Sequence, residues 1–199
     1  EYGASNSAFN QEQGYIQAKK AIQAASNLGI PEETTIYFAV DYDPQESEII
    51  NYVYPYFQGI NLYFAQSNKE YNIGVYGTRN VCRILKQYES SAFRIDNLFV
   101  SDASYGFSGN LGFTMPDEWA FDQFATDITI GEGTGKISID KVAISGIDKG
   151  FNSLSQSTQI EQVYKSLVKI ENLARTYLEH KGNDATALAV NSLTLQYLR

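Results

Sequence analysis

The feature that most constrains the fold is a short run of residues, 35–40 (TIYFAV), that is apolar on both faces of a strand. Such a strand has to be covered on both sides, as in a parallel sheet packed against helices. The run ends at residues 41–44 (DYDP), where proline forces the chain out of the strand. The sequence therefore predicts a buried parallel strand over residues 35–40.

Runs of the same kind recur along the chain and alternate with segments whose apolar residues have helical spacing. This alternation is typical of the α/β class, in which helices cover a parallel sheet. The spacing suits a (β/α) barrel as well as a doubly wound sheet. Helices are predicted over residues 12–28, 46–67 and 79–88, and further strands over residues 73–77, 98–102, 119–124 and 137–144, with a hairpin turn at residues 131–135.

The character of the sequence changes near residue 152. Residues 157–179 and 184–198 each place apolar residues at helical spacing. We expect a partial (β/α)-barrel domain over residues 1–152, followed by a helical tail, or the start of a second module, over residues 153–199.

The composition excludes several kinds of chemistry. The net charge of −8 disfavours nucleic-acid binding, because an acidic surface repels phosphate. His180, the only histidine, is expected at a helix end, so neither a Ser-His-Asp triad nor a histidine-rich zinc site can form in the main domain. Cys82, the only cysteine, lies in an apolar helical segment and is expected in the core. Carboxylates remain as the acid–base groups, and no cofactor or metal is expected.

Targeting and nucleotide-binding motifs are also missing from the sequence. No apolar run is long enough to span a bilayer, and the chain contains no signal peptide. The glycine-rich residues 131–135 are acidic and lead into a strand, whereas a phosphate-binding loop leads into a helix. A doubly wound nucleotide-binding domain is therefore disfavoured.

Two carboxylates follow the first predicted strand. Alternate residues of a strand share a face, so Tyr37 and Asp41 are expected on one face, and Phe38 and Val40 on the other, against helices. In a barrel, Asp41 then projects into the mouth that carries the active site of barrel enzymes, and Asp43 lies just past it. Two like charges this close can hold different protonation states, as glycoside cleavage requires. The alternative is a plain turn, since Asp and Pro also favour turns.

Polar residues occur at or near the ends of the other predicted strands as well. In the simplest interpretation, each of these side chains only has its hydrogen bonds satisfied within the protein. The four residues are Tyr76, Asp102, Gln123 and Asp140. Together, at one rim of a barrel, they are typical of a site that binds sugar. Trp119 is an aromatic residue that could stack on a sugar face or belong to the core. We take these five residues as candidate substrate-binding residues.

These segments, in this order, resemble a bacterial domain described as glycoside hydrolase-like, a relative of the family-25 lysozymes. The resemblance covers roughly residues 9–148. The late segments are similar to the lysozyme strands that carry Trp-Gln-Tyr and Val-Asp-Leu-Asn. The matching segments are residues 21–31, 36–43 (IYFAVDYD), 73–77 (IGVYG), 121–124 (FDQF) and 137–142 (ISIDKV).

The resemblance implies a TIM-type barrel, a wall-glycan substrate and no cofactor. By position, Asp41 and Asp43 take the places of an Asp-x-Glu pair in which the second residue is the general acid. Asp43 is one methylene shorter than that glutamate. Asp122 and Phe124 also depart from Trp-Gln-Tyr, which leaves Gln123 as the match.

The resemblance also implies that the first strands of the barrel, one with an acidic site residue, should precede Glu1. About 150 barrel residues fall short of the roughly 250 of a full barrel. We therefore expect an open sheet edge that is covered by the tail helices or by another copy of the chain, because bare edges invite association.

Two functional interpretations stay open. In the first, the domain is a glycoside hydrolase that cleaves peptidoglycan, or a related bacterial cell-wall glycan, through Asp41 and Asp43. In the second, it is a non-catalytic module that binds the wall glycan on a degenerate barrel. Both interpretations predict an extracellular or cell-wall-associated protein.

Overall fold

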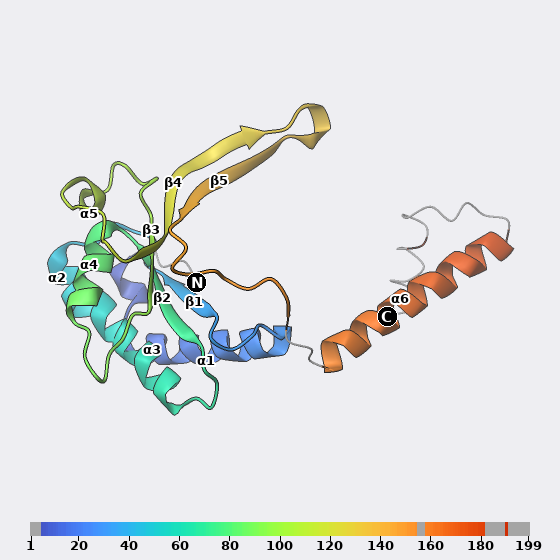
Figure 1. Ribbon diagram of the computed structural model, residues 1–199, viewed down its shortest axis with the longest axis horizontal. Helices are drawn as coiled ribbons and strands as arrows, with labels where there is room; N and C mark the ends of the chain where they lie inside the picture. Colours follow the sequence, from blue (N-terminus) through green and yellow to red (C-terminus); the bar gives the residue numbers. More distant parts are fainter. Residues whose placement is uncertain (1–4, 155–157, 182–189, 191–199) are drawn as a thin grey trace. The chain divides into compact units, whose positions relative to one another are not determined.

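The computed structural model describes residues 5–154, 158–181 and 190 (Figure 1). The chain forms two compact units, which are described separately below. The first unit comprises residues 1–26 and 30–153, and the second comprises residues 27–29 and 154–199. Among the described residues, none of the helices combines the length and the apolar character that crossing a bilayer requires.

The first unit is built on one curled five-stranded sheet with the order β1-β2-β3-β4-β5. The first four strands pair in parallel, as the alternating pattern predicts, and β5 pairs antiparallel with β4 through a hairpin. The sheet is a half-barrel, and the described residues do not close a full barrel. The strands are β1 (Thr35–Ala39), β2 (Asn72–Gly77), β3 (Asn97–Val100), β4 (Trp119–Ile130) and β5 (Ile137–Ile144).

The last strand corrects the parallel α/β interpretation. Only residues 131–136 separate β4 from β5, and a parallel connection needs a crossover of a dozen or more residues. Asp140 is therefore a mid-strand residue of an antiparallel pair, and its position is not the carboxyl end of a parallel strand.

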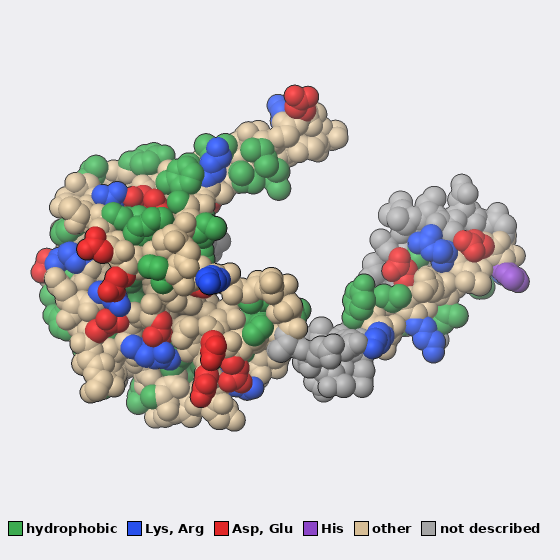
Figure 2. Space-filling model, in the orientation of Figure 1, with side chains coloured by type: hydrophobic (Ala, Val, Ile, Leu, Met, Phe, Trp, Pro, Cys, Tyr) green, Lys and Arg blue, Asp and Glu red, His purple; other side chains and the backbone are tan. Residues whose placement is uncertain are grey.

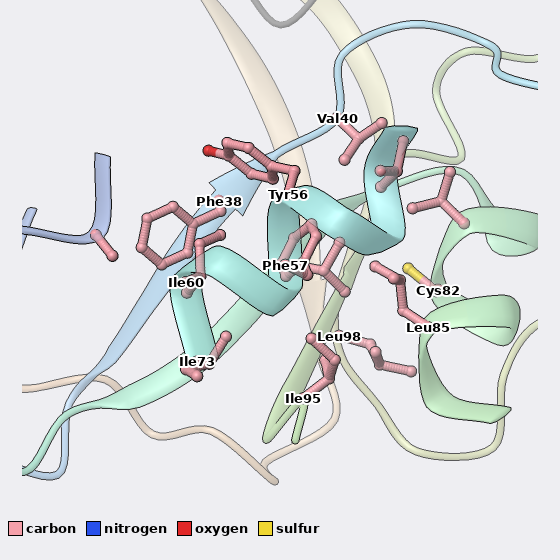
Figure 3. Close-up of a cluster of buried hydrophobic side chains, with 14 of the residues drawn as sticks. Phe38, Val40, Tyr56, Phe57, Ile60, Ile73, Cys82, Leu85, Ile95 and Leu98 are labelled. Carbon is pink, nitrogen blue, oxygen red and sulfur yellow. The ribbon is translucent and has the colours of Figure 1, made fainter. Parts of the chain in front are cut away.

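One face of the sheet is covered by three helices, α1 (Gln11–Leu28), α3 (Tyr54–Gln66) and α4 (Arg79–Gln87). Phe38 and Val40 of the first strand segment are buried in this layer, which confirms the predicted alternation of its side chains. Cys82 is fully buried there as well, and burial raises the pKa of its thiol to about 12. Figure 3 shows this core between the sheet, α3 and α4.

The predicted helix over residues 46–67 is interrupted. It consists of α2 (Glu46–Glu48), a π-helical turn η2 (Ile49–Val53) and α3. Pro55 lies in the first turn of α3 and has no backbone N–H to donate to the preceding turn. The amide of Tyr54 instead donates to the carbonyl of Ile49, five residues back. The π-helical turn therefore interrupts the predicted helix directly before α3.

The β4–β5 hairpin extends beyond the end of β3. Its distal part pairs Ile128 with Ile139 and Ile130 with Ile137, so these four side chains share one face. Ile130 and Ile137 are exposed, and Figure 2 shows apolar side chains along this projecting part. The distal hairpin therefore lies outside the core of the sheet.

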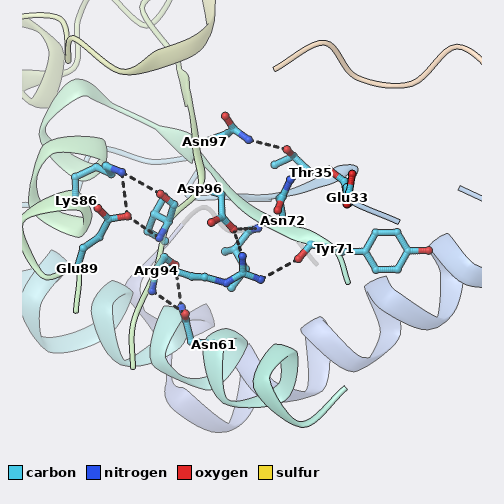
Figure 4. Close-up of polar contacts among 12 residues, drawn as sticks. Glu33, Thr35, Asn61, Tyr71, Asn72, Lys86, Glu89, Arg94, Asp96 and Asn97 are labelled. Atoms are coloured by element: carbon cyan, nitrogen blue, oxygen red, sulfur yellow. Dashed lines mark hydrogen bonds and ion pairs between the residues drawn. The ribbon is translucent and has the colours of Figure 1, made fainter. Parts of the chain in front are cut away.

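A polar network holds the amino ends of β2 and β3, which we call the amino edge (Figure 4). The side chain of Asn61, which is buried, accepts a hydrogen bond from the amide of Arg94 and donates to the carbonyls of Arg94 and Phe57. Asp96 accepts from the amide of Ile73 and pairs with the Arg94 guanidinium at 2.8 Å. These contacts fix the backbone that enters both strands.

The second unit contains α6 (Thr158–His180), which matches the first predicted tail helix. His180 lies in the last turn of α6, as expected. The second predicted tail helix, residues 184–198, lies outside the described residues, apart from Val190. The division into a domain over residues 1–152 and a tail over residues 153–199 stays a prediction.

Candidate functional site

The face of the sheet opposite the helices, which we call the inner face, carries a layer of aromatic rings. Tyr37, Tyr76, Phe99 and Phe121 contact one another with ring centroids 5.0–5.7 Å apart. They come from four adjacent strands, and each is partly exposed. The rings thus form a half-exposed aromatic floor.

A polar network lies beside this floor. The Tyr76 hydroxyl donates to Oε1 of Gln123 at 2.6 Å, and Nε2 of Gln123 donates to Oδ2 of Asp140 at 2.8 Å. A bulge in β4 brings the amide of Asp127 to Oδ1 of Asp140 at 3.1 Å. Three predicted substrate-binding residues, from three strands, therefore form one hydrogen-bonded chain.

Asp41 completes this group. Burial, together with the smaller effects of the negative charges of Asp41 and Asp140, raises the pKa of Tyr76 to about 12. The two carboxylates therefore both lie close enough to the Tyr76 hydroxyl to act on its charge. The Asp41 side chain is exposed and forms no hydrogen bond or ion pair with any residue in the described part of the chain. It is thus available to a ligand.

Asp43 is placed differently. Its Oδ2 accepts hydrogen bonds from the amide and the hydroxyl of Ser108, at 2.6 and 2.8 Å, and its Oδ1 accepts one from the amide of Gly109 at 2.9 Å. Three donors thus occupy the two oxygens of this carboxylate. The structure joins Asp43 to the loop between β3 and β4, whereas Asp41 faces solvent.

Asp102 belongs to a third group, at the start of α4. Its two oxygens form a bidentate pair with the Arg79 guanidinium, at 2.7 and 2.5 Å. Burial raises the pKa of the nearby Asp122, the charge of Asp102 raises it further, and that of Arg79 opposes the shift. One oxygen of Asp122 is buried without a hydrogen-bond partner among the described residues. Asp102 is therefore engaged within the protein.

Trp119 lies apart from these residues. It is the first residue of β4, opposite Leu98, and it packs against the hydrophobic core. The structure thus brings Asp41, Tyr76, Gln123 and Asp140 together, and it does not bring Asp43, Asp102 or Trp119 into their network. We call the first four residues the Tyr76 cluster.

The sequence interpretation missed two participants, Asp148 and Arg79. The hydroxyl of Tyr37 donates to Asp148 at 2.6 Å, and burial followed by this carboxylate raises the pKa of Tyr37. These partners are 111 residues apart, so no local pattern points to the contact. Arg79 could have been suspected from its place directly after the Thr78 cap. No group of three or more possible metal ligands occurs among the residues that the structure describes.

Comparison with protein families shows which family the chain is similar to. Residues 1–144 match the family of Rv2525c-like, glycoside hydrolase-like domains. Among relatives of Bacillus subtilis (strain 168), the uncharacterized protein FadG is 41% identical over 207 residues, which cover 100% of this chain and 34% of FadG. The uncharacterized protein YbfG is 44% identical over 158 residues, or 77% of this chain and 21% of YbfG. The chain thus spans about a third or less of these relatives.

Two crystal structures of the Tat-secreted protein Rv2525c of Mycobacterium tuberculosis share the fold. The complex with L-tartrate superposes with a TM-score of 0.51 at 17% identity, covering 68% of this chain and 58% of that chain. The complex with HEPES gives 0.52 at 16% identity, covering 71% and 61%. The curled sheet, its helical layer and the match over residues 1–144 agree: the chain belongs to the Rv2525c-like family of glycoside hydrolase-like domains.

Proposed function

We propose that this domain binds a bacterial cell-wall glycan, of the peptidoglycan type, on the inner face of its sheet. The observation that carries the proposal is the Tyr76 cluster beside the aromatic floor. Sugars offer hydroxyls to polar groups and apolar ring faces to aromatic side chains. The Tyr76 cluster has acceptors and donors for the first, and the floor has half-exposed rings for the second.

Asp41 is the central residue of this proposal. A carboxylate that has no partner among the described residues can accept hydrogen bonds from sugar hydroxyls at full strength. Asp140 also acts on the charge of the Tyr76 hydroxyl, and it retains acceptor capacity after its bonds to Gln123 and Asp127. Both carboxylates are exposed, so a ligand can reach them from solvent.

The second candidate function is hydrolysis of the same glycan. It is favoured by one observation, that two carboxylates both act on the pKa of one hydroxyl group. Glycoside cleavage uses a pair of carboxyl groups, one as acid and one as base or nucleophile. In this version Asp41 and Asp140 form the pair, and the sequence resemblance to the family-25 lysozymes suggests the reaction. The three hydrogen bonds to Asp43 weigh against Asp43 as the proton donor and favour a binding module.

One experiment tests both functions. The full chain, Asp41→Asn and Gln123→Ala are titrated with purified peptidoglycan and with soluble N-acetylglucosamine oligomers, and release of reducing ends is measured in parallel. We expect each variant to bind about tenfold more weakly, because hydrogen bonds to a charged or buried polar partner are lost. Asp117→Asn, which alters an exposed carboxylate ahead of β4, serves as the matched control.

The outcomes separate the two functions. Binding without release of reducing ends supports a binding module. Release that falls about a hundredfold or more in Asp41→Asn supports the hydrolase, in line with the loss of an acid–base group. If the unaltered chain binds none of these glycans, or if Asp41→Asn and Asp117→Asn behave alike, the proposal is wrong.

Location and self-association belong to the same proposal. The similar protein Rv2525c is Tat-secreted, which supports a location outside the cytoplasm for this domain. At β1, the first strand of the sheet order, a pocket of about 560 Å³ is lined by residues of the N-terminal segment, α1 and β1 itself. Within the described part of the chain no strand pairs with the outer edge of β1, and such an edge next to a pocket supports association with another strand or another copy of the chain. Concentration-dependent sedimentation would test that association.

A further inference from the structure

The residues between β3 and β4 contain a segment, 101–113, that carries the short helix α5 (Ser108–Leu111) (Figure 1). We call it the bridging loop. Near its start, the amide of Ala103 donates to the carbonyl of Gln123, in β4. Further on, Ser108 and Gly109 donate to Asp43, which follows β1. The bridging loop is therefore anchored on both flanks of the Tyr76 cluster.

Further contacts fix the loop along its length. The buried side chain of Asn110 donates to the carbonyls of Ser101 and Ser104, and its oxygen accepts from the amide of Arg79. The Arg79 guanidinium also donates to the carbonyl of Phe113 at 2.9 Å. With these bonds, the backbone at both ends of α5 (Ser108–Leu111) is held to the sheet and to α4.

Gly109 allows the close approach that these bonds require. A Cβ atom at this position would lie 2.5 Å from Oγ1 of Thr78, 2.9 Å from its Cβ and 3.0 Å from Oδ1 of Asp43. Thr78 is fully buried and its hydroxyl caps α4, so it has no room to move away. Any larger residue at position 109 would lift the loop from Asp43.

The tip of the bridging loop is exposed although its base is fixed. Tyr105 is 67% exposed, and Gly106 beside it is exposed as well. An exposed aromatic ring is stabilised when an apolar surface covers it, because apolar area is then removed from water. The pyranose face of a sugar is such a surface, and Tyr105 is only two residues from the amide that binds Gln123.

We propose that the bridging loop is a second glycan subsite, in which Tyr105 stacks on a sugar ring and Asp43 is the positioning residue that holds the loop. This inference rests on the proposed function, because it extends the ligand from the Tyr76 cluster to the loop tip. It assigns Asp43 a role different from acid catalysis. The ligand is then an oligosaccharide that reaches both regions.

The test uses N-acetylglucosamine oligomers of increasing length as the probe. Tyr105→Ala is expected to bind the longer oligomers about three- to tenfold more weakly, with little effect on the shortest, because one ring contact is lost. Tyr105→Trp restores the affinity. Tyr164→Ala is the matched control, since Tyr164 has the same exposure of 67% but lies on α6.

The role of Asp43 is tested separately. Asp43→Ala and Gly109→Ala are both expected to free the loop, to raise hydrogen exchange of its amides about tenfold and to weaken binding as Tyr105→Ala does. Adding Tyr105→Ala to either variant then changes affinity little, because the contact is already lost. Gly135→Ala is the control, because a Cβ there meets nothing within 4 Å and the residue lies outside the bridging loop.

Three results would overturn all or part of the inference. If the unaltered chain binds the oligomers and Tyr105→Ala binds them equally well, the subsite is wrong while the proposed function stands. If Asp43→Ala abolishes release of reducing ends and Gly109→Ala leaves that release intact, Asp43 acts in catalysis and its positioning role is wrong. Failure of the unaltered chain to bind any oligomer refutes the proposed function and the subsite together, and hydrogen exchange still reports whether Asp43 holds the loop.

Discussion

The two ends of the parallel strands use polar residues in opposite ways. At the amino edge, Asn61, Arg94 and Asp96 bind backbone groups and one another, and Asn61 is buried. At the carboxyl ends, Asp41 is exposed and has no partner among the described residues. Satisfied and buried polar groups serve the fold, whereas an exposed carboxylate without a partner is available to a ligand.

The comparison teaches that polar residues near strand ends are not equivalent even within one edge. Asp43 and Asp102 lie at the carboxyl ends of the strands, as Asp41 does, yet both are held by donors from the protein. They resemble the amino-edge residues in chemistry, although their position in the barrel is that of site residues. The following changes test this division, from the largest expected effect on stability to the smallest.

The largest effect is expected for Asn61→Ala at the amino edge. The change leaves the amide and the carbonyl of Arg94 without their buried partner, which costs about 1–3 kcal/mol for each such group. Urea denaturation should therefore show a loss of about 3 kcal/mol in the free energy of unfolding. Glycan affinity, measured on the folded fraction, should not change. A loss of affinity would mean that the amino edge contributes to binding.

A smaller loss is expected for Asp102→Asn at the carboxyl edge. The amide cannot form the bidentate ionic pair with Arg79, whose side chain is about a third exposed. Solvent screening reduces such a pair, so we expect a loss of about 1 kcal/mol. Since the charge of Asp102 also raises the pKa of Asp122, that pKa should fall in the variant, as measured by NMR titration. An unchanged pKa of Asp122 would contradict the placement of the two carboxylates.

A loss below about 0.5 kcal/mol is expected for Asp41→Asn, because the altered group is exposed and forms no bond in the described part of the chain. The loss of the Asp41 charge should, however, change the pKa of one specific residue, Tyr76. The negative charge of Asp41 raises the pKa of Tyr76, so this pKa should drop below about 12 in the variant. NMR titration of labelled tyrosine would measure it. A stability loss as large as that of Asn61→Ala would refute the contrast between the two edges.

The smallest effect is expected for Asp122→Asn, and it depends on pH. The pKa of Asp122 is raised above 3.8 in the folded protein, so ionisation costs stability above that raised pKa. The variant should be more stable than the unaltered chain at about pH 7, by a few tenths of a kcal/mol for a group this exposed. At about pH 3, where the carboxyl is protonated in both states, the two proteins should unfold alike. A variant that is less stable than the unaltered chain at neutral pH would contradict the expected sign of this stability difference.

Much of the fold follows from local patterns. The apolar runs predicted every strand, and the segment over residues 35–40 predicted which of its side chains meet the helices. Side-chain alternation did not predict the direction of β5, because it is the same in parallel and antiparallel strands. The predicted hairpin turn at residues 131–135 did indicate an antiparallel pair. One helix was predicted over residues 46–67, and the π-helical turn that interrupts it depends on packing around residues 49–53.

The candidate site divides in the same way. The sequence by itself determined that carboxylates, a tyrosine and a glutamine lie near strand ends, since strand ends and residue types are local properties. Only the tertiary structure decided that the charge of Asp41 acts on Tyr76 while Asp43, two residues later, binds a loop 65 residues away. Hydrogen-bond partners of a side chain come from whichever segments the fold brings within about 3 Å, and nothing in a local pattern records them.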